Sequence, residues 1–213
     1  MVYVVIAITT LIAYLLGSVN SAIIVGKLHK IDIREHGSGN AGLTNTLRVL
    51  GKKSAVYVLL GDILKAVIAI GIAKIIASFS FFPEEYFSLI TQLAGIAVVF
   101  GHIFPVYYGF KGGKGVLTSI TVMFMINWEV SLICLGLFII IVSITKFVSL
   151  GSVLGAIAFP CLVIFSNRIP FLTERHDMII FSLVIAIIVV VKHRTNIVRL
   201  LQGKENKLSF KKK

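Results

Sequence analysis

The stretch AVYVLLGDILKAVIAIGIAKIIAS, residues 55–78, decides the class of fold. Its charged residues are Asp62, Lys65 and Lys74 alone. A helix needs about 20 mainly apolar residues to cross a hydrocarbon core about 30 Å thick, and in lipid every backbone polar group must bond within the protein. The stretch therefore predicts a membrane-spanning helix.

Similar apolar runs recur along the chain of 213 residues, which is 57% hydrophobic with a mean hydropathy of +0.99. That is far more apolar surface than a soluble domain needs for one core. We expect an all-α membrane bundle that forms a single domain over residues 1–213. Its first run lacks a preceding basic segment and is expected to be a retained span, not a signal peptide. Seven spans are predicted, at about 2–25, 55–78, 87–107, 113–128, 130–146, 151–167 and 177–192.

The basic residues predict the orientation of these spans. Lys and Arg number 21 against 9 Asp and Glu, and with seven spans all but four of them fall in loops on one side. Cytoplasmic loops retain such an excess, so the N-terminus is expected outside and the C-terminus in the cytoplasm. This placement explains the net charge of +12 without a nucleic-acid partner. Within the second span, Asp62 and Lys65 at i, i+3 predict an ion pair facing the bundle interior, with a structural or a functional role.

The first cytoplasmic loop contains Gly37–Asn45, GSGNAGLTN. Glycines allow a close approach of the backbone to an anion, and successive N–H groups can form an anion-binding nest. Leu43, Leu47 and Leu50 predict a short helix at the membrane interface, with Arg48 nearby. A helix N-terminus after such a nest outlines a phosphate site, whereas the alternative is a flexible connection between spans. The candidate residues are Gly37, Ser38, Gly39, Asn40, Thr44, Asn45 and Arg48.

A second motif reads GHIFP at 101–105 and FKGGKG at 110–115. Lys111 and Lys114 beside flexible backbone at a helix start predict a second anion-binding segment. It is not a Walker A motif, because Gly115 stands where Ser or Thr would bind magnesium. The two lysines would also satisfy the cytoplasmic charge bias by themselves. The candidate phosphate-binding residues are Lys111, Gly112, Gly113, Lys114 and Gly115.

The third motif, KHRTNIVRLL at 192–201, follows the last span. On a helix that continues this span, His193 and Asn196 share a face, with Arg199 one turn further. A basic tail that attracts anionic lipid is the alternative. The three motifs together suit a substrate with more than one phosphate group. Because no His, Cys and carboxylate cluster has metal-ligand spacing, neither a metal nor another cofactor is expected.

With these motifs the sequence resembles the bacterial acyl-phosphate:glycerol-3-phosphate acyltransferases of the PlsY type. The resemblance implies a seven-span protein of the bacterial cytoplasmic (inner) membrane. It implies transfer of a fatty acyl group from acyl phosphate to the sn-1 hydroxyl of glycerol 3-phosphate, giving lysophosphatidic acid and phosphate in the first step of phospholipid synthesis. The residues that carry it are Gly37-Ser38-Gly39-Asn40, Thr44-Asn45, His102, Phe104-Pro105, the 111–115 motif, His193-Arg194, Asn196, Arg199 and Glu205.

By analogy with this family, the catalytic residues are expected to be Ser38, Arg48, Ser149, His193 and Asn196. Ser149 is chosen over Ser152 because it falls in a predicted cytoplasmic turn. No Ser-His-Asp or Cys-His arrangement is apparent, so direct attack is expected without an acyl-enzyme. The general base is either His193 or a phosphate oxygen of the substrate.

Membrane lipid and the enzyme that supplies acyl phosphate are the further partners expected. The rival hypothesis is a transporter for an organic phosphate. Transporter sites usually lie near the membrane midplane between internal repeats. Here the polar motifs gather at one predicted face, and no repeat between the halves is evident, which favours the enzyme.

Overall fold

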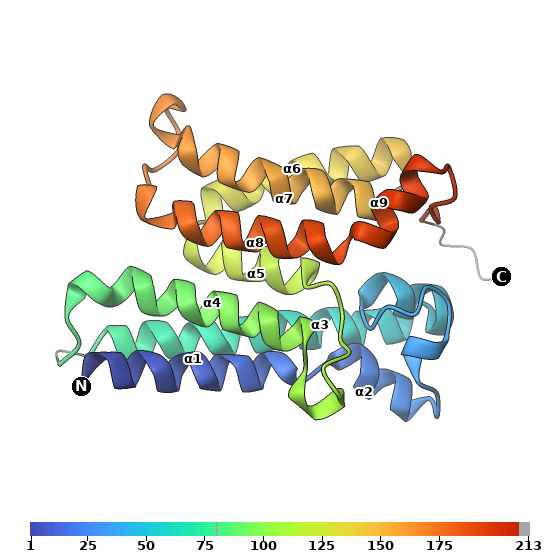
Figure 1. The fold of residues 1–213 in the computed structure, drawn as a ribbon, viewed down its shortest axis with the longest axis horizontal. Coiled ribbons are helices and arrows are strands. Elements are labelled where there is room, and N and C mark those ends of the chain that lie inside the picture. Colours follow the sequence, from blue (N-terminus) through green and yellow to red (C-terminus); the bar gives the residue numbers. More distant parts are fainter. Residues whose placement is uncertain (80, 209–213) are drawn as a thin grey trace. The chain divides into compact units, whose positions relative to one another are not determined.

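A computed structural model describes residues 1–79 and 81–208. These residues form helices and connecting loops without a β-strand, which confirms the all-α class (Figure 1). The chain divides into two compact units, one spanning Met1–Met125 and the other beginning at Ile126. The expectation that residues 1–213 act as one functional domain stays a prediction.

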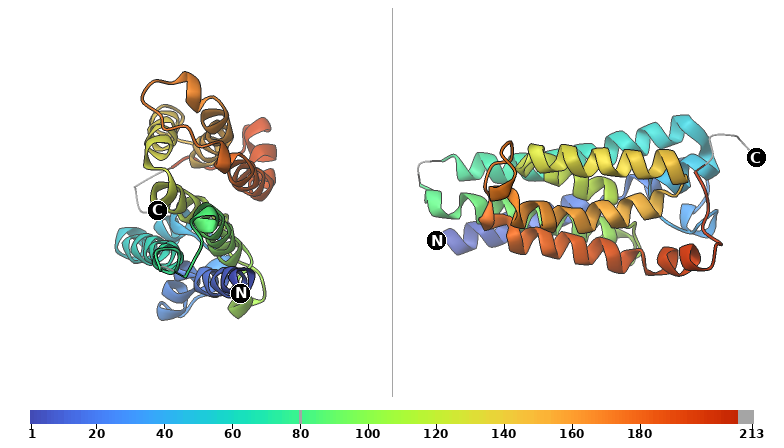
Figure 2. Two further views of the ribbon diagram at one scale, coloured as in Figure 1. Left: turned by 90° about the vertical axis from the view of Figure 1, so that its left-hand side faces the viewer. Right: turned by 90° about the horizontal axis from the view of Figure 1, so that it is seen from above.

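In the first unit, α1, α3 and α4 run side by side (Figures 1 and 2). The backbones of α1 and α4 come close because glycine lies at the contact: a Cβ on Gly17 would lie 2.2 Å from the carbonyl oxygen of Val98. Such small residues let apolar helices pack in lipid, where dispersion contacts must replace the hydrophobic effect. The elements are α1 (Val2–Ser18), α2 (Ser21–Leu28), η1 (Ile33–Glu35), α3 (Leu43–Ala77), η2 (Glu84–Tyr86), α4 (Phe87–Ile103), η3 (Val106–Tyr108) and α5 (Val116–Ile126).

Helix α3 is interrupted at Gly51, whose φ of +84° is left-handed backbone that glycine adopts without strain. Residues 43–50 therefore form a short helix of their own, as predicted; its place at the membrane interface stays a prediction. Further along α3, the expected ion pair is confirmed. Lys65 Nζ lies 2.9 Å from Asp62 Oδ1, and the two side chains are 5% and 2% exposed.

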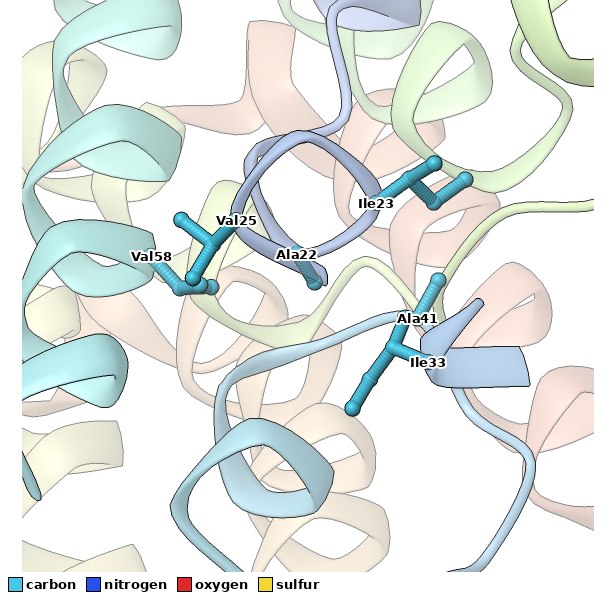
Figure 3. Close-up of a cluster of buried hydrophobic side chains, with 6 residues drawn as sticks. All are labelled: Ala22, Ile23, Val25, Ile33, Ala41 and Val58. Atoms are coloured by element: carbon cyan, nitrogen blue, oxygen red, sulfur yellow. The ribbon is translucent and has the colours of Figure 1, made fainter. Parts of the chain in front are cut away.

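A buried apolar cluster anchors the first loop against the helices around it. Its six side chains come from α2, from the loop that contains η1, and from α3 (Figure 3). Removal of such side chains from solvent stabilises the loop by about 25 cal/mol for each Å² buried. The loop is thus held to a defined path. The six residues are Ala22, Ile23, Val25, Ile33, Ala41 and Val58.

In the second unit, α6, α7 and α8 run side by side (Figures 1 and 2). Asn127 begins α6 by accepting a hydrogen bond from the Val130 N–H at 3.1 Å. Phe159 and Phe181 meet edge to face between α7 and α8, with ring centres 5.9 Å apart. The elements are α6 (Trp128–Thr145), α7 (Val148–Ile164), η4 (Ser166–Arg168), η5 (His176–Met178), α8 (Ile179–Lys192) and α9 (Arg194–Leu201).

Four helical segments in the described part of the chain are long and apolar enough to cross a membrane: Val2–Leu28, Leu43–Ala77, Glu84–Tyr108 and Trp128–Thr145. A fifth is counted if His176–Lys192 and the bent Arg194–Leu201 form one span. The apolar helices α5 and α7 are shorter, at 11 and 17 residues. A total of seven spans requires that α5 and α7 also cross the membrane. The number of spans and their orientation stay predictions.

Candidate functional site

The first motif is a loop organised from within by Asn45, the third residue of α3. The Asn45 Oδ1 atom accepts from the Ser38 N–H at 2.8 Å, and its Nδ2 donates to the carbonyls of Ile33 at 3.1 Å and His36 at 2.9 Å. Asn45 is buried, whereas Ser38 and Arg48 are exposed. In the structure Asn45 therefore holds the loop, and a direct contact between Asn45 and phosphate stays a prediction.

Glycine geometry fits this loop. Gly37 and Gly39 have φ values of +63° and +72°, in the left-handed region that favours glycine. A Cβ added to Gly37 would lie 2.4 Å from Asn45 Oδ1. A side chain at this position would therefore displace the Asn45 amide that holds the loop. The glycines predicted from the sequence are thus required by the loop's own conformation. Asn40 and Thr44 are partly exposed beside them.

The second motif packs directly against the first. A Cβ on Gly113 would lie 2.6 Å from the Ala41 carbonyl oxygen in the first loop and 2.2 Å from Nε2 of His102 on α4. The structure therefore brings the first two motifs together within one unit. Convergence with the third motif stays a prediction.

The backbone of this segment is held by the end of α4. The Gly112 N–H donates to the Ile103 carbonyl and the Gly113 N–H to the His102 carbonyl, both at 3.1 Å. These amides are engaged inside the protein, so the glycines shape the segment and the neighbouring lysines supply its positive charge. Lys111 is exposed and Lys114 partly exposed, while Gly115, with a φ of +80°, leads into α5.

A clamp between Asp32 and Arg34 joins the two loops and was not predicted from the sequence. The Arg34 guanidinium donates to both Asp32 carboxylate oxygens, with Nε–Oδ1 at 2.9 Å and Nη2–Oδ2 at 2.7 Å. Its Nη1 donates to the carbonyls of Tyr108 at 3.0 Å and Lys111 at 3.3 Å. The hydrogen bonds from Arg34 lower the pKa of Asp32 to about 2, so the carboxylate stays charged at neutral pH. The Asp-x-Arg spacing before the first motif was the available signal.

The third motif forms a separate polar cluster in the second unit around Glu205. Its Oε1 accepts from Ser149 Oγ at 2.9 Å and from Asn196 Nδ2 at 2.6 Å, and its Oε2 accepts from Arg199 Nε at 2.7 Å. The Glu205 side chain is only 6% exposed. Burial alone would raise its pKa, but these hydrogen bonds outweigh burial and hold the pKa below the usual carboxyl value.

The cluster distinguishes the two candidate serines. Ser149 lies in the first turn of α7, not in the preceding turn as expected, and points to Glu205. Ser152 Oγ donates to the Val148 carbonyl of its own helix at 2.9 Å. The position of Ser149 beside Asn196 agrees with the choice made from the sequence, while its catalytic role stays a prediction. Glu205 was not among the predicted site residues, although it was quoted with the third motif.

One expectation about the third motif is wrong. His193 does not lie on a continuing helix, because α8 ends at Lys192 and α9 starts at Arg194 with a bend of 58°. Even so, His193 and Asn196 are both buried, at 3% and 6% exposure. His193 Nδ1 lies 2.7 Å from the Val189 carbonyl oxygen, which can only accept. Nδ1 is therefore the protonated nitrogen, and in the neutral ring Nε2 carries the lone pair.

The family described as glycerol-3-phosphate acyltransferase matches residues 7–203. The chain belongs to this family. It is 44% identical to the glycerol-3-phosphate acyltransferase of Thermoanaerobacter pseudethanolicus, with 95% of this chain and 96% of the relative covered. It is 42% identical to that of Clostridioides difficile, with 99% and 97% covered.

Two solved structures are also similar along almost the whole chain. They are PlsY (YgiH), an integral membrane glycerol 3-phosphate acyltransferase, in its glycerol 3-phosphate form and in its lysophosphatidic acid form. Identities are 36% and 34% and TM-scores 0.80 and 0.79, and each comparison covers 96% of both chains. The protein is thus a membrane-embedded acyltransferase.

Proposed function

We propose that the acyl donor is acyl phosphate and that the acceptor is the sn-1 hydroxyl of glycerol 3-phosphate. The hydroxyl oxygen bonds to the acyl carbonyl carbon, and the bond from that carbon to the phosphate oxygen breaks. The products are lysophosphatidic acid and inorganic phosphate. The observation that carries this proposal is the full-length match to a family whose solved member has both a glycerol 3-phosphate form and a lysophosphatidic acid form.

His193 is proposed to accept the hydroxyl proton. Its Nδ1–H donates to the Val189 carbonyl, which leaves the Nε2 lone pair as the basic position of the neutral ring. Histidine is the side chain that enzymes use most often as a general base near neutral pH. The alternative base, a phosphate oxygen of the substrate, would leave His193 a hydrogen-bonding role.

Asn196 and Ser149 are proposed to orient the reacting groups. Both donate to Glu205 Oε1, so the carboxylate fixes the rotamers of an amide and a hydroxyl at once. A preorganised donor needs no reorganisation at the moment of reaction, which is how such groups lower a barrier. The hydroxyl of Ser149 can also accept a hydrogen bond from the substrate.

Phosphate binding is proposed for the segments of the first unit. Lys111 and Lys114 flank Gly112 and Gly113, and Arg48 is exposed one turn into the helix that follows the first loop. Cationic side chains around a phosphate form charge-assisted hydrogen bonds of about 1.5–3 kcal/mol each. Loss of one such contact is expected to weaken binding about tenfold to a hundredfold.

The enzyme is proposed to sit in a bacterial cytoplasmic membrane with seven spans, an outside N-terminus and a cytoplasmic C-terminus. The four long apolar helical segments, the bent pair and the two shorter apolar helices provide the segments for this count. The excess of Lys and Arg in the loops of one side supports the orientation. All three motifs then face the cytoplasm, where glycerol 3-phosphate and a donor-supplying enzyme would meet them.

The test is turnover by the purified protein reconstituted in lipid with acyl phosphate and glycerol 3-phosphate. Phosphate release matched by lysophosphatidic acid formation is expected, and an absence of both would reject the donor. A general base contributes about 10²- to 10⁴-fold, so His193→Ala is expected to lower kcat by at least about a hundredfold. His176→Ala, at the exposed start of η5 where the His176 Nδ1 lies 3.1 Å from the Glu174 carboxylate, is the matched control and should keep the wild-type kcat. Normal turnover by a folded His193→Ala protein would reject the assignment of the base.

A further inference from the structure

A buried polar network lies inside the first unit, and the proposed mechanism does not use it. Lys65 Nζ lies 2.9 Å from Asp62 Oδ1, 3.0 Å from the Val19 carbonyl oxygen and 2.9 Å from His102 Nδ1. The side chains of Lys65 and His102 are each 5% exposed. A lysine ammonium has three N–H donors and no acceptor, so each donor meets one of these three atoms.

This geometry fixes the tautomer of His102. Because the ammonium can only donate, His102 Nδ1 must be an acceptor, and the ring proton of the neutral imidazole is on Nε2. The Asp62 carboxylate is farther from Nδ1, at 3.7 Å, and is already bonded to Lys65 and, at 3.0 Å, to Ser21 Oγ. Lys65 is thus the nearer partner of Nδ1, at 2.9 Å against 3.7 Å for Asp62.

The other edge of the ring lies against the phosphate-binding segment. Nε2 of His102 would be 2.2 Å from a Cβ on Gly113, so the imidazole occupies the space that a side chain at that position would need. The backbone carbonyl of His102 also accepts from the Gly113 N–H at 3.1 Å. The placement of Gly112, Gly113 and Lys114 thus depends on where the His102 ring and main chain are held.

We infer that Lys65 is a positioning residue for the reaction: its ammonium holds His102 in the Nε2–H form, and His102 in turn holds the 112–114 segment where it binds the substrate phosphate. The inference rests on the proposed phosphate-binding role of that segment. A purely structural ion pair would need only Asp62 and Lys65, and burial of such a pair is weak evidence for stability. The third acceptor, a histidine in contact with Gly113, is the observation that points to function.

The first measurement is the protonation of His102, read from the ¹⁵N resonances of histidine-labelled protein in lipid and assigned with a His102→Asn variant. In the wild type, Nδ1 is expected to be unprotonated and Nε2 protonated. In Lys65→Met, the Asp62 carboxylate stays near Nδ1, at 3.7 Å in the wild type, so the proton is expected to move to Nδ1. A protonated Nδ1 in the wild type, or an unchanged ring in Lys65→Met, would overturn the inference.

The second measurement separates KM from kcat for glycerol 3-phosphate. Lys65→Met is expected to raise KM about tenfold with kcat within about threefold, as for the loss of one hydrogen-bonded contact to a charged group. The double variant Asp62→Asn/Lys65→Met leaves no unpaired charge, so it folds more readily than the single variant and should show the same rise in KM. Lys74→Met, farther along the same helix, where the lysine donates to the Met125 carbonyl, is the control and should keep the wild-type KM.

The outcomes separate this inference from the proposed function. A fall in thermal stability with an unchanged KM in both Lys65 variants would mean that the pair is structural, and the inference would be rejected. Failure of the wild type itself to turn over acyl phosphate would reject the proposed function, and the protonation of His102 would still report on the role of Lys65. A rise in KM together with the proton shift supports both.

Discussion

Gly113→Ala is the substitution whose effect the structure determines most directly. The added Cβ would lie 2.2 Å from His102 Nε2 and 2.6 Å from the Ala41 carbonyl oxygen, whereas ordinary contacts begin at 3.4 Å. His102 is held by Lys65 and Ala41 is fully buried, so neither neighbour can retreat easily. The segment itself must therefore move by about 1 Å. Overpacking of this kind costs about 1–3 kcal/mol.

A displacement of about 1 Å in a substrate-positioning group can lower activity about a hundredfold. We therefore expect kcat/KM for glycerol 3-phosphate to fall between about tenfold and a hundredfold, chiefly through KM. The assay is phosphate release by the reconstituted protein over a range of glycerol 3-phosphate concentrations. Gly71→Ala is the matched control, because a Cβ on that helical glycine meets nothing within 4 Å. Equal kcat/KM values for the two variants would refute the argument from packing.

Three further predictions concern pH, metal ions and topology. Burial raises the pKa of Glu205, but its hydrogen bonds outweigh burial and leave the folded pKa below the ordinary value of 4.5. The ionised carboxylate therefore stabilises the fold above pH 4.5, and this stabilisation is lost as pH falls through the folded pKa. Glu205→Gln should thus lower the thermal midpoint at pH 7 with a smaller deficit in acid, and a deficit that grows in acid would contradict this. Activity should persist in EDTA, and loss that added magnesium or zinc restores would reveal a metal requirement. The orientation can be tested with single cysteines in a background without Cys134 and Cys161. A cysteine in place of Ser38 should react with an impermeant thiol reagent only in opened cells, whereas a cysteine in place of Glu85 should react in intact cells. The reverse labelling would overturn the orientation.

Local features of the chain could be predicted well because they depend on neighbours in sequence. The i, i+3 spacing of Asp62 and Lys65 places them on one face of any helix, and the structure confirms the pair at 2.9 Å. The break at His193 could not be predicted in the same way. Lys192 and Arg194 are both compatible with a continuous helix, and the bend of 58° appears only in the folded chain.

The hydrogen-bond partners of the motif residues could not be predicted, because these partners are distant in sequence. Arg34 contacts the carbonyls of Tyr108 and Lys111, more than 70 residues away. Glu205 accepts a hydrogen bond from Ser149, which is 56 residues away in the sequence. This contact distinguishes Ser149 from Ser152 by geometry. Periodicity and local spacing carry no information about such contacts, since they arise when separate helices pack.

The all-α membrane class follows from the sequence alone, because the length of apolar runs and the placement of charges act locally through the energetics of the lipid bilayer. The three motifs can likewise be read from the sequence. The reason why Gly112 and Gly113 are glycines comes instead from the packing of the folded chain. The sequence suggested that their backbone approaches phosphate, whereas the fold shows their amides bonded to α4 and their side-chain space filled by His102, Pro105 and Ala41. Steric exclusion depends on atoms from remote segments, and only the packed chain brings those atoms within contact distance.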